Sequence, residues 1–195
     1  MEVLTQEELY NSKNKYIELM KGEVFVHPTE WGYALSCDAT NSELIKKIRN
    51  AKNTHLQPFS IIPPNKEWVI KNCELNDAQK RYLDTLGKRV SIDDKEHIVT
   101  LVLKLKNLDS IAPNVAPGLK TIGIKIPSHW FSEVVKYIGK PLVSTSANVV
   151  GDNFVTSLED LSSNIKKIVK IAINDGEKKG IPTIVIQPHN YKERV

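Results

Sequence analysis

The sequence predicts a single α/β domain over residues 1–195, in which helices flank a twisted and mostly mixed β-sheet. Three observations lead to this fold class. A chain of 195 residues can bury a sizeable core within one domain. Hydrophobic residues make up 41% and charged residues 26% of the chain, as in an ordinary globular protein. Segments with helical spacing and short apolar segments alternate along the chain, without an internal repeat or a linker, and this alternation is typical of α/β proteins.

In the first half of the chain, caps and turn residues bound the expected elements. Thr5 and Glu8 form the capping box of a first helix, and Gly22 stands where the C-terminal cap of that helix belongs. Asn41 or Ser42 caps a second helix, which ends in a basic turn. The elements expected here are helices at 5–22, 43–51, 67–72 and 77–86, strands at 23–27 and 59–62, and a loop at 27–30.

The second half of the chain contains the clearest strand, at 99–105. Val99 and Leu101 face one side of this strand and Thr100 faces the other. Ser128 is expected to cap a helix that carries a core-facing apolar stripe. The remaining elements expected here are a loop at 107–120, a strand at 121–126, the helix 128–138 ended by Gly139, strands at 142–143, 168–173 and 183–187, a short helix from Ser157, and a charged tail at 188–195.

Composition and the first residues exclude several classes of protein. No apolar run approaches the roughly 20 residues that a membrane span requires, and the acidic, polar residues 1–8 are unlike a signal peptide. Cys37 and Cys73 have neither the spacing of metal ligands nor the density of a disulfide scaffold. We therefore expect a protein of the reducing cytoplasm, and we also expect a monomer. The net charge of +4 permits contact with nucleic acid without arguing for it, since only four of the 27 basic residues are arginine.

The stretch with the most chemical content is 140–148 (KPLVSTSAN), closed by Gly151. It begins as a short apolar strand and turns into hydroxyl and amide side chains, a composition that a folded core does not require. A strand that ends in small polar side chains and free backbone N–H groups commonly lines a ligand site in an α/β protein. The alternative is a Ser/Asn turn after a strand, because these residues also satisfy turns by themselves. Composition alone leaves both interpretations open.

Other ligand-binding patterns are absent from the sequence. It contains neither GxxxxGK[ST] nor GxGxxG, which argues against P-loop and dinucleotide-binding folds. The five histidines are scattered, without an HxxxH or CxxC pattern, so no metal site is expected. Cys37 is interpreted as a small packed residue rather than a reactive thiol.

Residues 144–151 (STSANVVG) resemble the STSANxSG signature of the YrdC/YwlC family, the threonylcarbamoyl-AMP synthases. The resemblance extends from about Glu23 to Gln187. The other family motifs and their positions here are PTDTVYGL at 28–35, GCDA at 36–39, KxR at 52–54, the threonine of PGPxT at Thr100, RIP at 125–127 and GRPST at 180–183. The resemblance implies a YrdC-like domain with a large concave cavity on its sheet.

The resemblance also implies an enzyme of the nucleotidyltransferase class. Members of the family make threonylcarbamoyl-adenylate and pyrophosphate from L-threonine, bicarbonate and ATP, and other proteins then pass the threonylcarbamoyl group to an adenosine beside the tRNA anticodon. The implied substrates and partners are ATP with Mg²⁺ bound through it, L-threonine, bicarbonate, the downstream transfer proteins, and tRNA or double-stranded RNA. Such a reaction needs cations, hydroxyls and backbone N–H groups that stabilise the charge on departing pyrophosphate.

The matching motif positions carry the implied site. Lys52 is the cation of the KxR motif and the implied catalytic residue, and the alternative is a lysine that only compensates the helix dipole. No residue is implied to hold a metal of its own. The residues implied to bind ATP or substrate are Thr29, Tyr33, Lys52, Thr100, Lys125, Ser144, Thr145, Ser146 and Asn148.

The chain departs from the family pattern at several positions. Trp31 replaces a threonine associated with the substrate threonine, and Thr54 and Ile181 replace arginines. Lys125 also replaces an arginine, and a lysine keeps the positive charge but cannot bind a phosphate in the bidentate way of a guanidinium. Residues 96–98 (EHI) stand where PGP is expected. Each lost charge-assisted phosphate contact is worth about 1.5–3 kcal/mol. The sequence therefore also allows a degenerate member that binds nucleotide or RNA without turnover, and a pocket reshaped for another amino acid.

Overall fold

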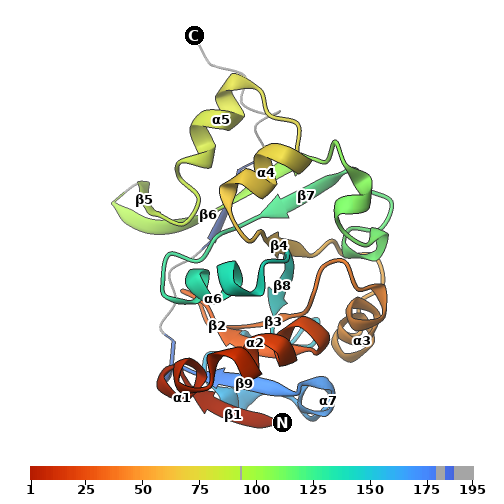
Figure 1. Cartoon of the computed structure of the whole chain (residues 1–195), viewed down its shortest axis with the longest axis vertical. Helices are drawn as coiled ribbons and strands as arrows, with labels where there is room; N and C mark the ends of the chain where they lie inside the picture. Colours follow the sequence, from red (N-terminus) through yellow and green to blue (C-terminus); the bar gives the residue numbers. More distant parts are fainter. Residues whose placement is uncertain (93, 179–182, 187–195) are drawn as a thin grey trace.

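A mixed sheet runs through the molecule, and helices cover both of its faces (Figure 1). The computed structural model describes residues 1–92, 94–178 and 183–186. Ten strands of these residues form the sheet in the order β1-β9-β2-β3-β8-β4-β7-β6-β10, and β5 pairs with β6. The strands are β1 (Glu2–Thr5), β2 (Phe25–Pro28), β3 (Tyr33–Ser36), β4 (Ser60–Ile62), β5 (Arg89–Ile92), β6 (Lys95–Lys104), β7 (Thr121–Ile124), β8 (Leu142–Ser146), β9 (Ile171–Asn174) and β10 (Thr183–Ile186).

Helices and short 3₁₀ turns connect the strands. The pairs β1–β9, β2–β9, β4–β7 and β6–β10 are parallel, and the pairs β2–β3, β3–β8, β4–β8, β5–β6 and β6–β7 are antiparallel. This confirms the predicted α/β class with a mixed sheet. The connecting elements are α1 (Gln6–Asn11), α2 (Lys13–Gly22), α3 (Ser42–Lys52), α4 (Lys66–Asn72), α5 (Asp77–Leu83), η1 (Leu108–Ser110), η2 (Pro113–Val115), α6 (Phe131–Ile138), η3 (Leu158–Asp160) and α7 (Ser163–Ile168).

Two apolar clusters hold the helices to the sheet, one on each face. On one face α1, α2 and α6 pack on β1, β2 and β9, with Phe131 against Phe25 at the centre. On the other face α3 and α7 pack on the middle strands, where Ile45 and Ile165 join Leu35. All five side chains are fully buried. Because successive strand residues point to opposite faces, β2, β4, β8 and β9 each contribute to both clusters.

Several helix ends form as the sequence predicts. The Thr5 hydroxyl accepts a hydrogen bond from the Glu8 N–H, and the Glu8 carboxylate accepts one from the Thr5 N–H. Asn41 caps α3 with its side chain, and Gly139 ends α6 with a φ of 73°. Each of these signals acts within a few residues of chain, which is why the sequence alone reveals them.

Other helix predictions are wrong. Ser12, with φ −124° and ψ 39°, interrupts the expected helix 5–22 and divides it into α1 and α2. Gly22 is the last residue of α2 and does not adopt the left-handed conformation of a glycine cap. Ser128 does not cap α6, which begins after Trp130 without a side-chain cap. The Ser128 hydroxyl instead donates to Glu30, 98 residues away, so a long-range partner replaces the local one.

The sheet is larger than predicted. Strands β1, β3 and β5 are not expected from the sequence. In β3 the reason is that all four residues are buried, so polar and apolar residues do not alternate along the strand. Strand β8 continues to Ser146, so the serines and threonine after Val143 pair within the sheet rather than form a turn. The expectations for residues 180–182 and 187–195 lie outside the described residues.

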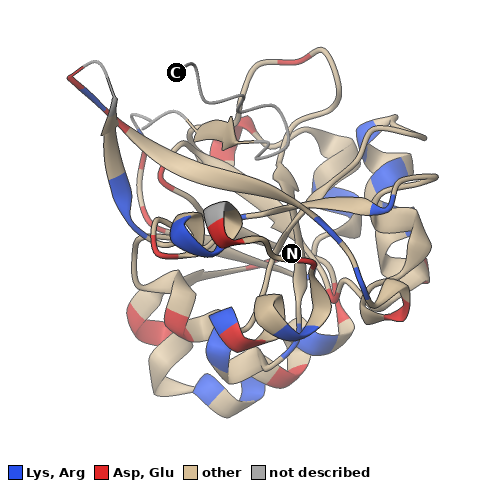
Figure 2. Ribbon diagram, turned by 90° about the horizontal axis from the view of Figure 1, so that it is seen from above, with Lys and Arg blue, Asp and Glu red and all other residues tan. Residues whose placement is uncertain are grey.

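The surface carries charges of both signs. Figure 2 shows lysine and arginine interspersed with aspartate and glutamate, and in this view neither sign forms a continuous stripe over the described residues. Several of these charges are paired, including Lys104 with Glu74 at 2.9 Å and Arg89 with Glu96 at 3.0 Å. A helix long and apolar enough to cross a bilayer is not found in the described part of the chain.

Candidate ligand-binding site

A cavity of about 360 Å³ opens where the β2–β3 hairpin meets the ends of β4, β7 and β8. Four of the predicted site residues line it, namely Thr29, Tyr33, Lys125 and Ser146. Apolar and aromatic side chains supply most of the remaining wall. The other lining residues are His27, Glu30, Trp31, Ala34, Ile62, Ile98, Ile126, Pro127, Phe154, Val155 and Thr183.

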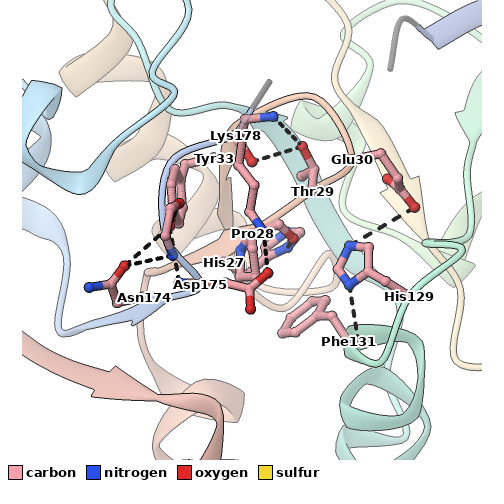
Figure 3. A network of polar contacts seen from close by, with 12 residues as sticks. His27, Pro28, Thr29, Glu30, Tyr33, His129, Phe131, Asn174, Asp175 and Lys178 are labelled. Carbon is pink, nitrogen blue, oxygen red and sulfur yellow. Dashed lines mark hydrogen bonds and ion pairs between the residues drawn. The ribbon is translucent and has the colours of Figure 1, made fainter. Parts of the chain in front are cut away.

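The turn of the β2–β3 hairpin forms one wall, and its conformation is fixed by Thr29. The Thr29 N–H donates to the Gly32 carbonyl at 2.7 Å, and the Thr29 hydroxyl accepts from the Gly32 N–H at 3.0 Å (Figure 3). The Trp31 N–H donates to the same hydroxyl, which itself donates to the Gly32 carbonyl. The Thr29 side chain is therefore engaged in shaping the turn, although it faces the cavity.

Tyr33 ties the hairpin to the end of β9. Its hydroxyl donates to the Gly176 carbonyl at 2.7 Å and accepts from the Asp175 N–H at 3.0 Å (Figure 3). Burial raises the pKa of the Tyr33 phenol, so the group stays protonated and keeps both bonds. Tyr33 thus lines the cavity, while its hydroxyl is hydrogen-bonded to the backbone that follows β9.

Replacing Gly32 with alanine is expected to destabilise the protein by about 1–3 kcal/mol, the range for overpacking. A Cβ at this position would lie 2.5 Å from the Val155 carbonyl oxygen, which accepts the Tyr33 N–H at 2.9 Å. Chemical denaturation measures the effect. The control is Gly22→Ala in α2, where no atom lies within 4 Å of an added Cβ and a gain of about 0.5 kcal/mol is expected. A Gly32→Ala protein as stable as the wild type contradicts the prediction.

The end of β8 is held from behind by Lys52, the last residue of α3. The Lys52 ammonium donates to the carbonyl oxygens of Ser146 at 2.5 Å and Asn148 at 2.6 Å. Its side chain is almost completely buried, and burial lowers the pKa of Lys52 to about 8. The interpretation of Lys52 as a lysine that only compensates the helix dipole does not describe these contacts. Lys52 lies behind the cavity wall and is not among the residues that line it.

The remaining predicted site residues lie farther from the cavity. Ser144 is buried, and its hydroxyl has no partner among the described residues. Thr145, its neighbour on β8, points to the opposite face of the sheet. Asn148 closes the loop after β8 by donating its side-chain N–H to the Asp152 carbonyl at 2.8 Å. Thr100 is buried on β6, close to Gly123 of the neighbouring strand.

The departures from the family motifs change the composition of the site. Trp31 packs edge-to-face on Phe154 with ring centroids 5.4 Å apart, and both rings line the cavity. Thr54 is buried, and nearby Arg49 uses its guanidinium to bind the carbonyls of Gln57, Asn114 and Val115, so this arginine is structural. Among the described residues, the cavity wall therefore contains one cationic side chain, Lys125.

Sequence reasoning missed the polar cluster at the inner end of the cavity. His27 and Glu30 line it, and the Ser128 N–H and hydroxyl both donate to Glu30. The His129 ring lies 4.0 Å from the same carboxylate (Figure 3). Burial lowers the pKa of Lys125, and the nearby Glu30 carboxylate opposes this shift. A histidine at the end of a buried strand directly before the hairpin turn is the signal that could have indicated His27. No group of three or more metal-ligating side chains occurs within the described ranges.

An open mixed sheet whose strand ends surround a cavity with hydroxyl, carboxylate and ammonium groups defines an α/β ligand-binding protein. The sequence model of the Sua5/YciO/YrdC family, described as "Telomere recombination", matches residues 18–195, and the chain belongs to this family. This match confirms the resemblance found in the motifs. It begins a few residues before Glu23, where the motif resemblance begins, and extends through the C-terminal residues.

Individual relatives are similar at modest identity. A putative threonylcarbamoyl-AMP synthase from Methanocaldococcus jannaschii is 27% identical over 177 residues, which cover 90% of this chain and 79% of that protein. The uncharacterized protein YciO of Escherichia coli K12 is 25% identical over 89% of this chain and 82% of its own length. The structure of P. abyssi Sua5 complexed with L-threonine superposes with a TM-score of 0.80 at 19% identity, over 98% of this chain but 55% of that one. This structural likeness shows the fold, and the chain spans about half of the P. abyssi protein.

Proposed function

We propose that this protein is a nucleotidyltransferase similar to threonylcarbamoyl-AMP synthases, which makes threonylcarbamoyl-adenylate from L-threonine, bicarbonate and ATP. The main support is the Lys52 contact with the end of β8, because it joins the lysine of the KxR motif to the 144–151 motif beside the cavity. Relatives named threonylcarbamoyl-AMP synthase and a related protein solved with L-threonine give further support. In this proposal the product serves tRNA modification through separate transfer proteins.

The proposed reaction forms a carbamate first and an adenylate second. The ammonium group of L-threonine first loses a proton to solvent, and the free amino nitrogen adds to the bicarbonate carbon with loss of water. A carbamate oxygen then attacks the α-phosphorus of ATP while the bond to pyrophosphate breaks. Mg²⁺ bound to the phosphates of ATP would supply charge neutralisation there. Lys125 supplies positive charge from the cavity wall, and Ser146 supplies a hydroxyl. Lys52 holds the backbone of β8 that presents this hydroxyl.

The reaction predicts pyrophosphate release that requires all three substrates. We expect release when the protein is incubated with ATP–Mg²⁺, bicarbonate and L-threonine, and none above background when either L-threonine or bicarbonate is omitted. A coupled pyrophosphate assay measures the rate, and mass spectrometry identifies the adenylate. A folded protein that releases no pyrophosphate with the complete mixture contradicts the proposed function.

A second candidate is a binding protein that keeps the cavity but does not turn over. Two observations favour it: Lys52 is committed to backbone carbonyls, and Lys125 is the one cation that the described residues place in the cavity wall. With these two lysines placed in this way, a bound triphosphate would have few direct cationic partners. This candidate predicts micromolar or weaker binding of nucleotide or tRNA with a strong salt dependence. Binding that is independent of salt contradicts the RNA-binding version.

A further inference from the structure

The ring of His27 is fixed in one orientation at the inner end of the cavity. It is completely buried at the end of β2 and stacks on Phe131 with centroids 4.1 Å apart and planes 5° apart. Its Nδ1 lies 2.9 Å from the Pro28 carbonyl oxygen. Because a carbonyl oxygen only accepts, Nδ1 must carry the hydrogen, and Nε2 must present its lone pair.

The lone pair of His27 Nε2 has no protein partner among the described residues. A buried acceptor without a partner is destabilising, so buried polar groups of this kind are normally satisfied. Burial lowers the pKa of His27 to about 3, and nearby Lys125 and His129 act in the same direction. The imidazole therefore stays neutral and available as an acceptor across the physiological pH range.

Glu30 places a second acceptor on the same wall. Its Oε1 accepts from the Ser128 N–H at 2.5 Å and the Ser128 hydroxyl at 2.9 Å. His129 Nδ1 accepts the Phe131 N–H at 3.3 Å, so in the neutral ring Nε2 carries the hydrogen, 4.0 Å from the same Glu30 oxygen (Figure 3). All of these contacts go to Oε1. The other oxygen, Oε2, takes no bond from the described residues and is left for a ligand.

We propose that His27 Nε2 and Glu30 Oε2 receive a primary ammonium group of the bound ligand, which makes His27 and Glu30 specificity-determining residues of this cavity. Two acceptors, one of them anionic, match a group that carries several N–H donors and a positive charge. Lys125 on the same wall would repel that charge unless the ligand also carries an anion near it, as an α-amino acid does. Only the identity of the amine, the amino group of L-threonine, rests on the proposed function.

Histidine ¹⁵N spectra of the wild-type protein test the proposal directly, because they report hydrogen bonding at each imidazole nitrogen. We expect the His27 Nε2 signal to shift and saturate on titration with methylammonium, the minimal probe, and with L-threonine. We expect no shift with 3-hydroxybutanoate, which lacks the amino group. In His27→Phe, which keeps a ring against Phe131 but has no acceptor, L-threonine affinity should fall at least tenfold. His55→Phe, the same change at an exposed histidine that does not line the cavity, should leave the affinity within twofold of the wild type.

The outcomes separate this inference from the proposed function. A response to methylammonium but not to L-threonine supports the amine site and contradicts threonine as the substrate. Pyrophosphate release without any shift of His27 Nε2 by either amine overturns the amine site and leaves the reaction standing. A shift that 3-hydroxybutanoate produces as well as L-threonine also overturns it, because His27 would then contact another part of the ligand or an ordered water.

Discussion

Replacing Lys52 with methionine is expected to lower the rate of pyrophosphate release at least tenfold and to destabilise the protein by about 2 kcal/mol at pH 7. Methionine fills the space of the lysine stem but leaves the carbonyls of Ser146 and Asn148 without their donor. The end of β8 is then held less firmly against α3. The matched control is Lys47→Met on the same helix, where the lysine is exposed and neither quantity should change measurably. Equal rates in Lys52→Met and the wild type contradict the prediction.

The Lys52 contribution to stability should also depend on pH. Burial lowers the pKa of Lys52 from 10.5 to about 8, so the folded protein releases this proton at a lower pH than the unfolded chain does. Between about pH 8 and pH 10.5 the unfolded chain binds more protons, and stability therefore rises with pH in that window. The stability difference between wild type and Lys52→Met should widen by about 3 kcal/mol, at 1.36 kcal/mol per pKa unit. Urea denaturation of both proteins at pH 7 and pH 10.5 measures the difference, and an unchanged difference contradicts the burial of a charged lysine.

Replacing Phe131 with alanine is expected to cost about 3–5 kcal/mol, the usual range for a large aromatic side chain in a core. Phe131 is completely buried between Phe25 and the ring of His27. Chemical denaturation measures the loss. Tyr137→Ala on the same helix is the control, because Tyr137 is 51% exposed and should cost less than about 1 kcal/mol. A loss for Phe131→Ala no larger than that of the control contradicts the packing role.

The same variant tests the surroundings of His27. With Phe131 removed, water can reach the imidazole, and the pKa of His27 should rise from about 3 towards its usual value of 6.5. The pKa of His27 rises because burial disfavours the charged ring and hydration removes that penalty. An NMR pH titration of His27 in wild type and Phe131→Ala measures this shift. A His27 that still does not titrate above pH 4 in a folded Phe131→Ala protein contradicts the stacking argument.

The fold class and the family could be predicted from local patterns. The capping box at Thr5, the cap at Asn41 and the glycine at Gly139 each act over a few residues, and each forms as expected. The motif at 144–151 identifies the family because it is a contiguous run of residues. Strand β3 was missed for a physical reason: a strand buried on both faces has no alternation of polar and apolar residues.

The sequence by itself therefore determined the α/β class, the family and the segments that surround the cavity. Only the tertiary structure decided what each polar side chain does. Lys52 meets Ser146 across 94 residues, Glu30 meets Ser128 across 98, and Tyr33 meets Gly176 across 143. These partners are brought together by strand order rather than by spacing along the chain, so no local pattern encodes them. For the same reason the structure, and not the motif, shows that Lys52 supports the wall of the site from behind and that His27 and Glu30 face its interior.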